Sequence, residues 1–357
     1  MSQTKVSNTF IDNNRPFRNI VINGDMQVSQ RGDSTGVNST GFYGPDRYKL
    51  YTANNAGAFS VSQSGTAPGD FGLNYSYKLA CTTADTSVAA GEYVFLQTSF
   101  ETQNLQHLRK GLSDAKKLYL SFYAKADASL TYVVEVYDNE HDRIQSQTFA
   151  VTTSWQRFTF EIPADTNGEI LANNNTAGMS VHWWLHGGTD YTSGTLSGSW
   201  ANRTNTNRAA GIGSVLASTD REFYLTGVQL ELGGVSDFEH VPHDVQLTRC
   251  QRYYQKWQAD QTYDQMGEGA AWSDTAFIWS YRLCPRMRAQ PSATVTGNLA
   301  GAMVGNDRAL SSIQINRTTV DVCQFTSAIS DNNEQGTPGF CRDNNDGDAK
   351  VEFDAEL

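Results

Sequence analysis

Carboxylate and imidazole side chains gather near the middle of the chain, at Asp237, Glu239, His240 and His243. A carboxylate beside an imidazole is the combination that general acid–base catalysis uses. Pro242 interrupts the cluster, and the residue before a proline is driven towards an extended backbone. Because the cluster directly follows a strand pattern, we interpret it as a hydrogen-bonded surface segment after a core strand and not as a catalytic centre.

Other catalytic signatures give no stronger indication. The chain contains no His-Glu-x-x-His, phosphate-binding or dinucleotide-binding motif. A glycosidase needs two carboxylates that face each other across a cleft, and no pair stands out among the 38 acidic residues. The sequence therefore predicts that the protein is not an enzyme. A surface-polysaccharide depolymerase with a site between subunits is the weaker alternative.

Possible metal ligands also lack a suitable arrangement. His182 and His186 have the spacing of a zinc pair on a helix, but their segment alternates apolar and polar residues as a strand does. In a strand, these two positions would lie about 13 Å apart at roughly 3.3 Å per residue. The segment 343–348 resembles a calcium loop whose glycine comes one position early. We therefore predict no cofactor and assign no metal ligand, and one structural calcium ion stays an open alternative.

A long polar segment holds the residue types that bind sugars. Gly187–Gly213 is rich in Gly, Ser, Thr and Asn, and loops of such length in a compact domain are usually functional or mobile. Sugar rings present apolar C–H faces beside hydroxyls, so their sites pair flat aromatic rings with planar polar side chains. For Trp200 in this segment, the alternative is that the ring anchors the loop to the sheet. The predicted glycan-binding residues are Trp200, Tyr191, Arg203, Asn202 and Trp184.

Strands are the elements that must position these residues, because apolar and polar side chains alternate along much of the chain. Asn23-Gly24 predicts a hairpin turn near the start. Short strands with few helices between them imply two antiparallel sheets packed face to face. The predicted strands are Tyr48–Thr52, Ala58–Gln63, Tyr75–Cys81, Tyr93–Thr98, Leu118–Lys125, Leu130–Tyr137, Arg143–Ala150, Trp155–Ile162 and Met179–Leu185.

Length and pattern together predict an all-β protein with more than one domain. A chain of 357 residues exceeds what one hydrophobic core normally serves. We predict a jelly-roll-like antiparallel β-sandwich over residues 16–243 and a second, smaller β domain over 258–357. A short linking helix is predicted between them over 244–257, with Asp244 as its N-cap. The polar residues 1–15 are predicted to form an attachment arm.

Charge and cysteine content limit the partners and the compartment. The net charge of −11 argues against nucleic acid and against anionic lipid surfaces as partners. Five cysteines without a close pair are typical of reduced thiols in a protein folded in a reducing cytoplasm. The start of the chain lacks the apolar run of a signal peptide, and no run is long enough to insert into a membrane.

Seven segments, taken in order, resemble a recurrent module of bacteriophage virion proteins, chiefly tail-fibre and other receptor-binding or structural proteins. The resemblance extends from about residue 16 to 256, and its motifs have the character of fold and interface signatures. The matching segments are NIVINGDMQVSQRG (19–32), PDRYKLY (45–51), LYLSFYAKA (118–126), SWQRFTFEIP (154–163), TGVQLELG (226–233), FEHVP (238–242) and CQRYYQK (250–256).

The resemblance implies a function in the virus particle. It implies a non-enzymatic tail-fibre or tail-tip protein with a carbohydrate-binding-module-like sandwich that recognises host-surface polysaccharide or lipopolysaccharide. It further implies a homotrimer that docks on other virion proteins through residues 1–15 and is made in the host cytoplasm without a signal peptide. A head fibre, capsid decoration or connector with a purely structural role is the alternative.

Overall fold

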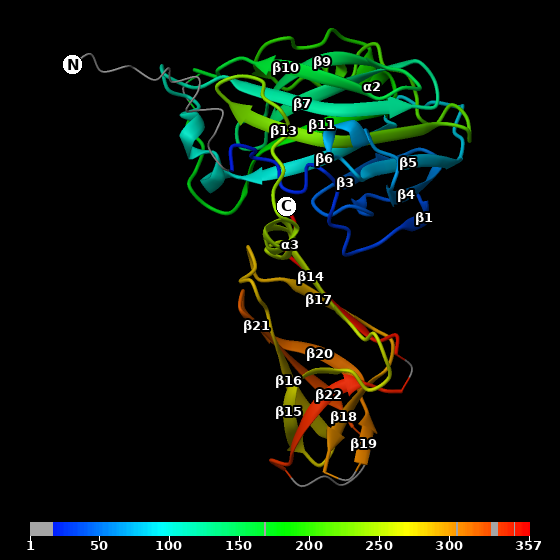
Figure 1. Ribbon diagram of the computed structural model, residues 1–357, viewed down its shortest axis with the longest axis vertical. Helices are drawn as coiled ribbons and strands as arrows, with labels where there is room; N and C mark the ends of the chain where they lie inside the picture. Colours follow the sequence, from blue (N-terminus) through cyan, green and yellow to red (C-terminus); the bar gives the residue numbers. More distant parts are fainter. Residues whose placement is uncertain (1–16, 168, 305, 330–334, 346) are drawn as a thin grey trace, which may run out of the picture. The chain divides into compact units, whose positions relative to one another are not determined.

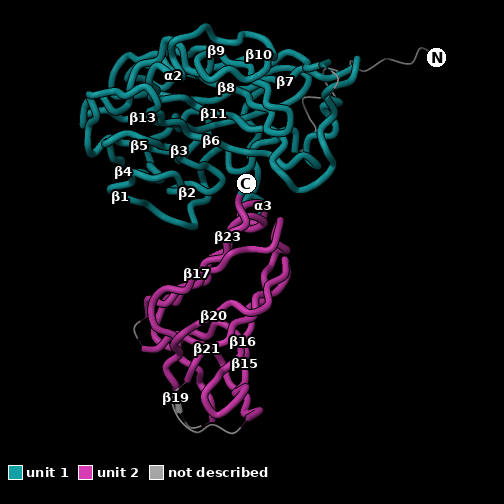
Figure 2. Tube along the Cα trace, turned by 180° about the vertical axis from the view of Figure 1, so that it is seen from behind, with its two compact units in different colours: residues 1–246, 357 teal, residues 247–356 magenta. Residues whose placement is uncertain are grey.

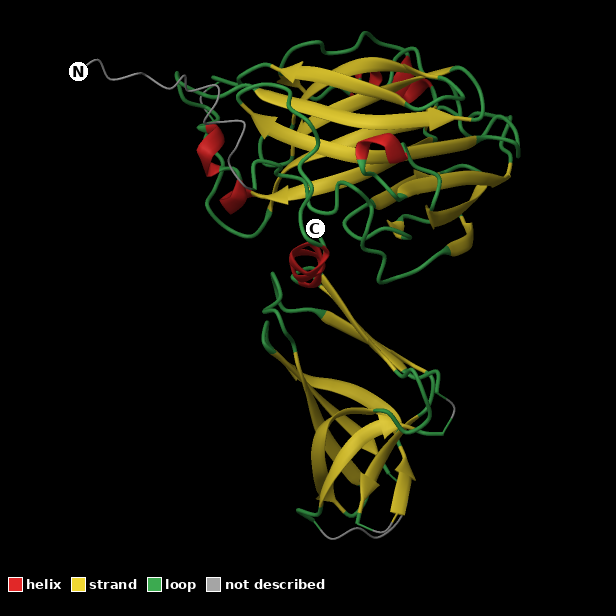
Figure 3. Cartoon of the chain, viewed as in Figure 1, coloured by secondary structure: helices red, strands yellow, loops and turns green. Residues whose placement is uncertain are grey.

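The computed structural model describes residues 17–167, 169–304, 306–329, 335–345 and 347–357. They form two compact units (Figure 2): the first runs to Gln246 and includes Leu357, and the second is Leu247–Glu356. Strands dominate both units (Figure 3), which confirms the predicted all-β class. The predicted attachment arm, residues 1–15, lies outside the described residues.

Two antiparallel sheets make up the described part of the first unit (Figure 1). All nine strands predicted between residues 48 and 185 are present, as β3 to β11. Sheet A has six strands in the order β1 (Ser34–Val37), β4 (Ala58–Ser64), β5 (Ser76–Thr83), β13 (Glu222–Leu232), β7 (Leu118–Ala126) and β10 (Gln156–Ile162). Sheet B has seven in the order β12 (Ala201–Asn202), β9 (Arg143–Val151), β8 (Leu130–Asp138), β11 (Ala177–Gly187), β6 (Tyr93–Glu101), β3 (Lys49–Ala53) and β2 (Gly41–Phe42).

The hydrophobic core of the first unit lies between sheets A and B, because side chains alternate between the two faces of each strand. Phe122 on β7 meets Trp183 on β11 edge-to-face, with ring centroids 5.7 Å apart. Tyr132 on β8 meets Phe223 on β13 in the same way at 5.5 Å. All four rings are fully buried. The next residue on β11, Trp184, therefore points to the outer face of sheet B.

The hairpin predicted at Asn23-Gly24 is not formed, and these residues pack against β13 instead. The Asn23 side chain accepts a hydrogen bond from the Val28 amide (2.9 Å) and donates to the Val28 carbonyl (2.8 Å), which closes a loop without a strand pair. The Gly24 carbonyl accepts from the Val228 amide (2.8 Å), and a Cβ on Gly24 would lie only 2.1 Å from the Val228 oxygen. Glycine is required where the N-terminal segment approaches β13 so closely.

The segment after β13 holds the start of the same N-terminal segment in place. Glu239 accepts hydrogen bonds from the backbone amides of Phe17 (2.6 Å) and Asn19 (2.8 Å). The Asn19 side chain in turn accepts from the Leu230 amide of β13 (3.0 Å). Glu239 therefore ties the N-terminal segment to the end of β13, which confirms the predicted hydrogen-bonded surface segment.

The second unit contains two sheets in its described residues. The predicted helix over 244–257 is too long: α3 is His243–Gln251, and Tyr254–Gln258 is strand β14 because it finds a ladder partner in β23 (Lys350–Asp354). β17 (Ser292–Thr296) completes the three-stranded sheet C. Trp279 and Phe325 stack at 4.0 Å in the core of this unit. Sheet D has seven strands in the order β19 (Asn306–Ala309), β18 (Leu299–Met303), β22 (Pro338–Asp343), β15 (Gln265–Ser273), β16 (Ala276–Arg282), β21 (Val322–Ala328) and β20 (Ser311–Thr318).

Candidate functional site

The long segment between β11 and β13 covers part of the outer face of sheet B. It contains three short elements, α2 (Thr189–Thr192), β12 and η4 (Asn205–Asn207). Trp184 has no exposed surface. Tyr191 packs on Trp184 and on Tyr93, with ring centroids 5.4 and 5.3 Å apart. Two of the predicted glycan-binding residues thus meet, but the buried Trp184 ring presents no face on which a sugar could stack.

Arg208 fastens this segment to a buried carboxylate on sheet B. Its guanidinium donates to Glu135 on β8, with Nη2 2.6 Å from Oε1 and Nε 3.1 Å from Oε2. His182 Nδ1 lies 2.8 Å from the same carboxylate, and the guanidinium lies 4.7 Å from the centre of the Trp184 ring. Burial would raise the pKa of Glu135, but Arg208 and His182 outweigh it and bring the pKa to about 2. Glu135 is therefore a buried anion held by a buried cation.

Ser180, His182 and Glu135 have the connectivity of a serine-hydrolase triad. Ser180 Oγ lies 2.8 Å from His182 Nε2, and His182 Nδ1 lies 2.8 Å from Glu135. A working triad also needs a path for the substrate to the hydroxyl and hydrogen-bond donors for an oxyanion. Ser180 has no exposed surface, and its hydroxyl accepts a further hydrogen bond from Asn139 (3.2 Å). The arrangement satisfies buried polar groups and joins β8 to β11.

A Gly-x-Ser-x-Gly spacing also occurs, at Gly32–Gly36. In hydrolases this pattern places the serine on a sharp turn between a strand and a helix. Here Ser34 begins the edge strand β1 and pairs with Val61 of β4. The spacing therefore has no catalytic geometry.

The two histidines of β11 have separate partners and do not form a metal pair. His186 contacts Glu92 (3.1 Å) and Ser214 (2.7 Å), whereas His182 contacts Glu135. Within the described residues, no group of three or more His, Cys, Asp or Glu side chains is placed to hold a metal ion. No helix in the same residues is both long and apolar enough to cross a membrane.

The remaining predicted glycan-binding residues lie beside β9 and do not join the Tyr191–Trp184 pair. Trp200 is half-buried against the core, and its indole N–H donates to the Pro163 carbonyl (2.8 Å). Asn202 lies in β12, which pairs with β9. Arg203 pairs with Asp142 at 2.6 Å. The geometry of Trp200 is that of a ring that anchors its own loop.

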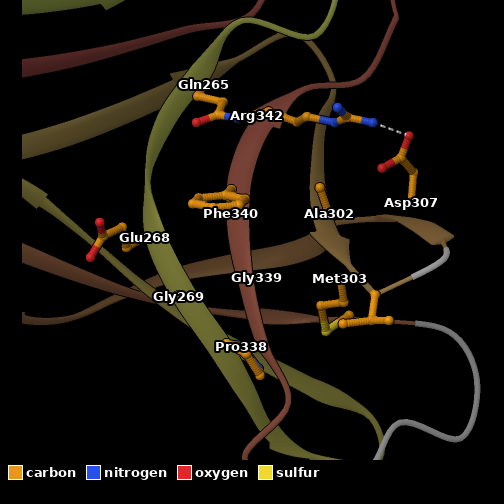
Figure 4. A pocket seen from close by; sticks show the side chains of 11 residues that line it. Gln265, Glu268, Gly269, Ala302, Met303, Asp307, Pro338, Gly339, Phe340 and Arg342 are labelled. Carbon is orange, nitrogen blue, oxygen red and sulfur yellow. Dashed lines mark hydrogen bonds and ion pairs between the residues drawn. The ribbon is translucent and has the colours of Figure 1, made fainter.

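A hollow of about 800 Å³ lies on sheet D of the second unit (Figure 4). Phe340 on β22 stands within it, and its side chain is 44% exposed. Its cross-strand neighbours are Glu268 on β15 and Ala302 on β18. Gly269 and Gly339 also line the hollow. An exposed aromatic ring is therefore held on a central strand of a sheet.

Planar polar side chains line the same hollow. Gln265 and Glu268 lie on β15, and Arg342 extends from β22 towards Asp307 of β19, with which it forms an ion pair (Figure 4). The guanidinium also lies 4.5 Å from the centre of the Tyr263 ring, so two partners fix its position. An aromatic ring flanked by an amide, a carboxylate and a guanidinium matches the apolar faces and hydroxyls of a sugar.

This hollow does not follow from the sequence, because the strands that form it have weak strand patterns. Glycine is unfavourable in strands, and these strands contain Gly267, Gly269, Gly301 and Gly339. A usable signal was present in β22, where exposed Phe340 precedes buried Cys341 and half-buried Arg342. That alternation marks a strand with one face towards solvent.

The chain matches no family model, and no curated protein matches it. Among solved structures it is similar to CBM4, with 15% sequence identity over 59% of this chain and 98% of that chain and a TM-score of 0.31. It is similar to the family 11 carbohydrate-binding module from Clostridium thermocellum in complex with a β-1,3-1,4-mixed-linked tetrasaccharide, with 13% identity over 58% and 98% and a TM-score of 0.26. It is also similar to the enzymatically active domain of tailspike protein 4 of bacteriophage CBA120, with 10% identity over 61% and 22% and a TM-score of 0.32. Similarities this low assign no ligand to the chain.

Proposed function

We propose that the chain is a non-enzymatic bacteriophage virion protein, of the tail-fibre or tail-tip kind, that binds glycans on the host surface. The observation that carries the glycan-binding part is the hollow around Phe340, where an exposed ring is flanked by Gln265, Glu268 and Arg342. The virion part is supported by the seven ordered sequence motifs between residues 19 and 256. The homotrimer and the docking through residues 1–15 belong to the same proposal.

Replacing Phe340 with alanine tests the glycan-binding part. Affinity electrophoresis through gels that contain neutral polysaccharides or bacterial lipopolysaccharides measures retardation of the full chain. Loss of an aromatic stacking partner worth about 1.4 kcal/mol weakens binding about tenfold. Because the ring is exposed, the melting temperature is expected to stay unchanged. Trp272→Ala is the matched control: Trp272 is 62% exposed on β15 and does not line the hollow. Equal retardation of F340A and wild type in every gel would refute this binding site.

Two carboxylates on opposite sides of the Phe340 ring give a second candidate, a polysaccharide hydrolase. Glu268 lies on one side and Asp307 on the other (Figure 4), and a pair of carboxylates that flank a sugar is what glycosidases use. Reducing ends released from polysaccharides that retard the chain, and abolished by Glu268→Gln, would establish the hydrolase. Prolonged incubation without release would remove it.

Antibody labelling of intact particles tests the virion part. Label at the tail supports the proposed tail-fibre or tail-tip location, and label on the head would replace it by the head-fibre or decoration alternative.

Sedimentation of the purified chain tests the homotrimer, since a monomer at micromolar concentration would contradict it.

A further inference from the structure

The outer face of sheet A carries a row of aromatic and cationic side chains. Lys78 on β5, Tyr224 on β13 and Lys125 on β7 are paired in register across three neighbouring strands. Trp155 directly precedes β10, which pairs with β7. Because cross-strand neighbours in register project to the same face of a sheet, Lys78, Tyr224 and Lys125 form a row. The contacts of Trp155 with Tyr224 and Lys125 extend this row by one residue.

Within this row, the Lys125 ammonium is held between two rings. Its Nζ lies 4.6 Å from the centre of the Tyr224 ring and 5.6 Å from the centre of the Trp155 ring. The rings meet edge-on, with centroids 6.2 Å apart and an interplanar angle of 72°. A cation over an aromatic face is attracted by the ring quadrupole. The rings therefore place the Lys125 charge without neutralising it.

The nearby carboxylates are occupied by other cations. Glu222 pairs with Lys78 (2.7 Å), and Asp127 pairs with Arg221. In the part of the chain that the structure describes, no carboxylate lies within ion-pair distance of Lys125. The row thus contains one positive charge without a carboxylate partner on a protein whose net charge is −11.

We propose that this row, the Lys125 row, binds the uronic-acid residues of an acidic polysaccharide. The half-buried Trp155 indole supplies an apolar face for the sugar ring, and the Lys125 ammonium supplies the partner for its carboxylate. The overall negative charge repels polyanions at long range, so binding has to come from local contacts of this kind. The ligand class rests on the proposed glycan-binding function, but the site is separate from the Phe340 hollow.

Affinity electrophoresis in gels of polygalacturonate, alginate or hyaluronan, with dextran as the neutral reference, tests the Lys125 row. We expect Lys125→Gln to weaken binding to at least one uronate polymer about fivefold, the factor that an exposed ion pair contributes. Trp155→Ala is expected to weaken uronate binding at least as much. In dextran gels, K125Q is expected to migrate like the wild type. Lys117→Gln is the matched control, because Lys117 is 54% exposed just before β7 and already pairs with Glu161 (2.5 Å).

The outcomes separate this site from the Phe340 hollow. F340A is expected to be retarded by uronate polymers like the wild type. Wild-type retardation of K125Q, an equal loss in K117Q, or no retardation of the wild-type chain by any of the three uronate polymers would overturn the Lys125 row. The Phe340 test in neutral polysaccharides and lipopolysaccharides would still stand. Conversely, F340A could lose binding to neutral polysaccharides and keep its binding to uronate polymers. That result would support both sites as separate.

Discussion

Replacing Arg208 with methionine removes the cation that compensates a fully buried carboxylate. Glu135 has no exposed surface. Its partner Arg208 lies 73 residues further along the chain. Methionine keeps much of the side-chain volume while it removes the charge and the hydrogen bonds. The variant therefore isolates the contribution of this ion pair to the stability of the first unit and to the docking of the segment over sheet B.

The pKa of Glu135 sets the scale of the expected loss. It lies at about 2 against its usual 4.5, and a tenfold change in proton affinity corresponds to about 1.4 kcal/mol, so the ionised form gains about 3 kcal/mol from its surroundings. Removing one partner of a buried ion pair typically costs about 3–5 kcal/mol. We expect R208M to lower the unfolding free energy at pH 7 by about 3 kcal/mol and Tm by about 6–12 °C.

The contribution of Glu135 to the pH dependence of stability is expected to change sign in the variant. In the wild type the folded-state pKa of Glu135 is depressed, so its contribution is complete above about pH 4.5 and is lost as the pH falls towards about 2. Without Arg208, burial dominates and raises that pKa above 4.5. The variant is therefore expected to lose less stability than the wild type, or to gain some, as the pH falls below neutral.

Differential scanning calorimetry of the unfolding transition of the first unit, at pH 7 and at lower pH, measures both the loss of stability and its pH dependence. Arg203→Met is the matched control, because Arg203 lies in the same segment but its pair with Asp142 is exposed, so its loss is expected to cost at most about 0.5 kcal/mol. The double variant E135Q/R208M is expected to recover part of the loss, since a neutral amide needs no cation. A Tm for R208M within about 2 °C of the wild type at pH 7 would refute the reasoning.

Three further variants test individual contacts. Trp200→Phe keeps a ring against the core but loses the hydrogen bond to the Pro163 carbonyl. We expect thermal unfolding to show about 1 kcal/mol less stability. Because the Trp200 ring anchors its loop, retardation in glycan gels is expected to stay unchanged. Glu239→Ala leaves the amides of Phe17 and Asn19 without their acceptor, so their hydrogen exchange is expected to accelerate at least tenfold, and wild-type rates would contradict the contact. Gly24→Ala puts a Cβ 2.1 Å from a carbonyl oxygen and is expected to lower Tm strongly, whereas Gly65→Ala, with open space around its Cβ position, is expected to change little.

The strands of the sandwich could be predicted from the sequence, because apolar and polar residues alternate within each strand and no distant residue is needed to see it. Trp183 and Trp184 illustrate this: their opposite faces follow from adjacency on a strand alone. The path of the segment 187–213 could not be predicted in this way, since it depends on Arg208 finding Glu135 at a distant position. Of the predicted glycan-binding residues, Tyr191 of that segment therefore packs on Trp184 of β11, whereas Trp200 anchors the segment beside β9. The Phe340 hollow was missed because glycines weaken the strand pattern of β15 and β22.

Among the described residues, burial separates polar groups that the protein itself satisfies from polar groups that reach solvent. Burial lowers the pKa values of His182 and His186, and both side chains, like Glu135, have their hydrogen bonds met by protein groups. A general acid or base has to reach its substrate, which these buried groups do not do. Phe340 and Lys125 are among the groups that reach solvent, and both lie on strands, so little conformational freedom is lost when a ligand binds. Single sites of this kind are weak, and under the proposed homotrimer the engagement of several copies would raise the affinity about 10²–10⁴-fold.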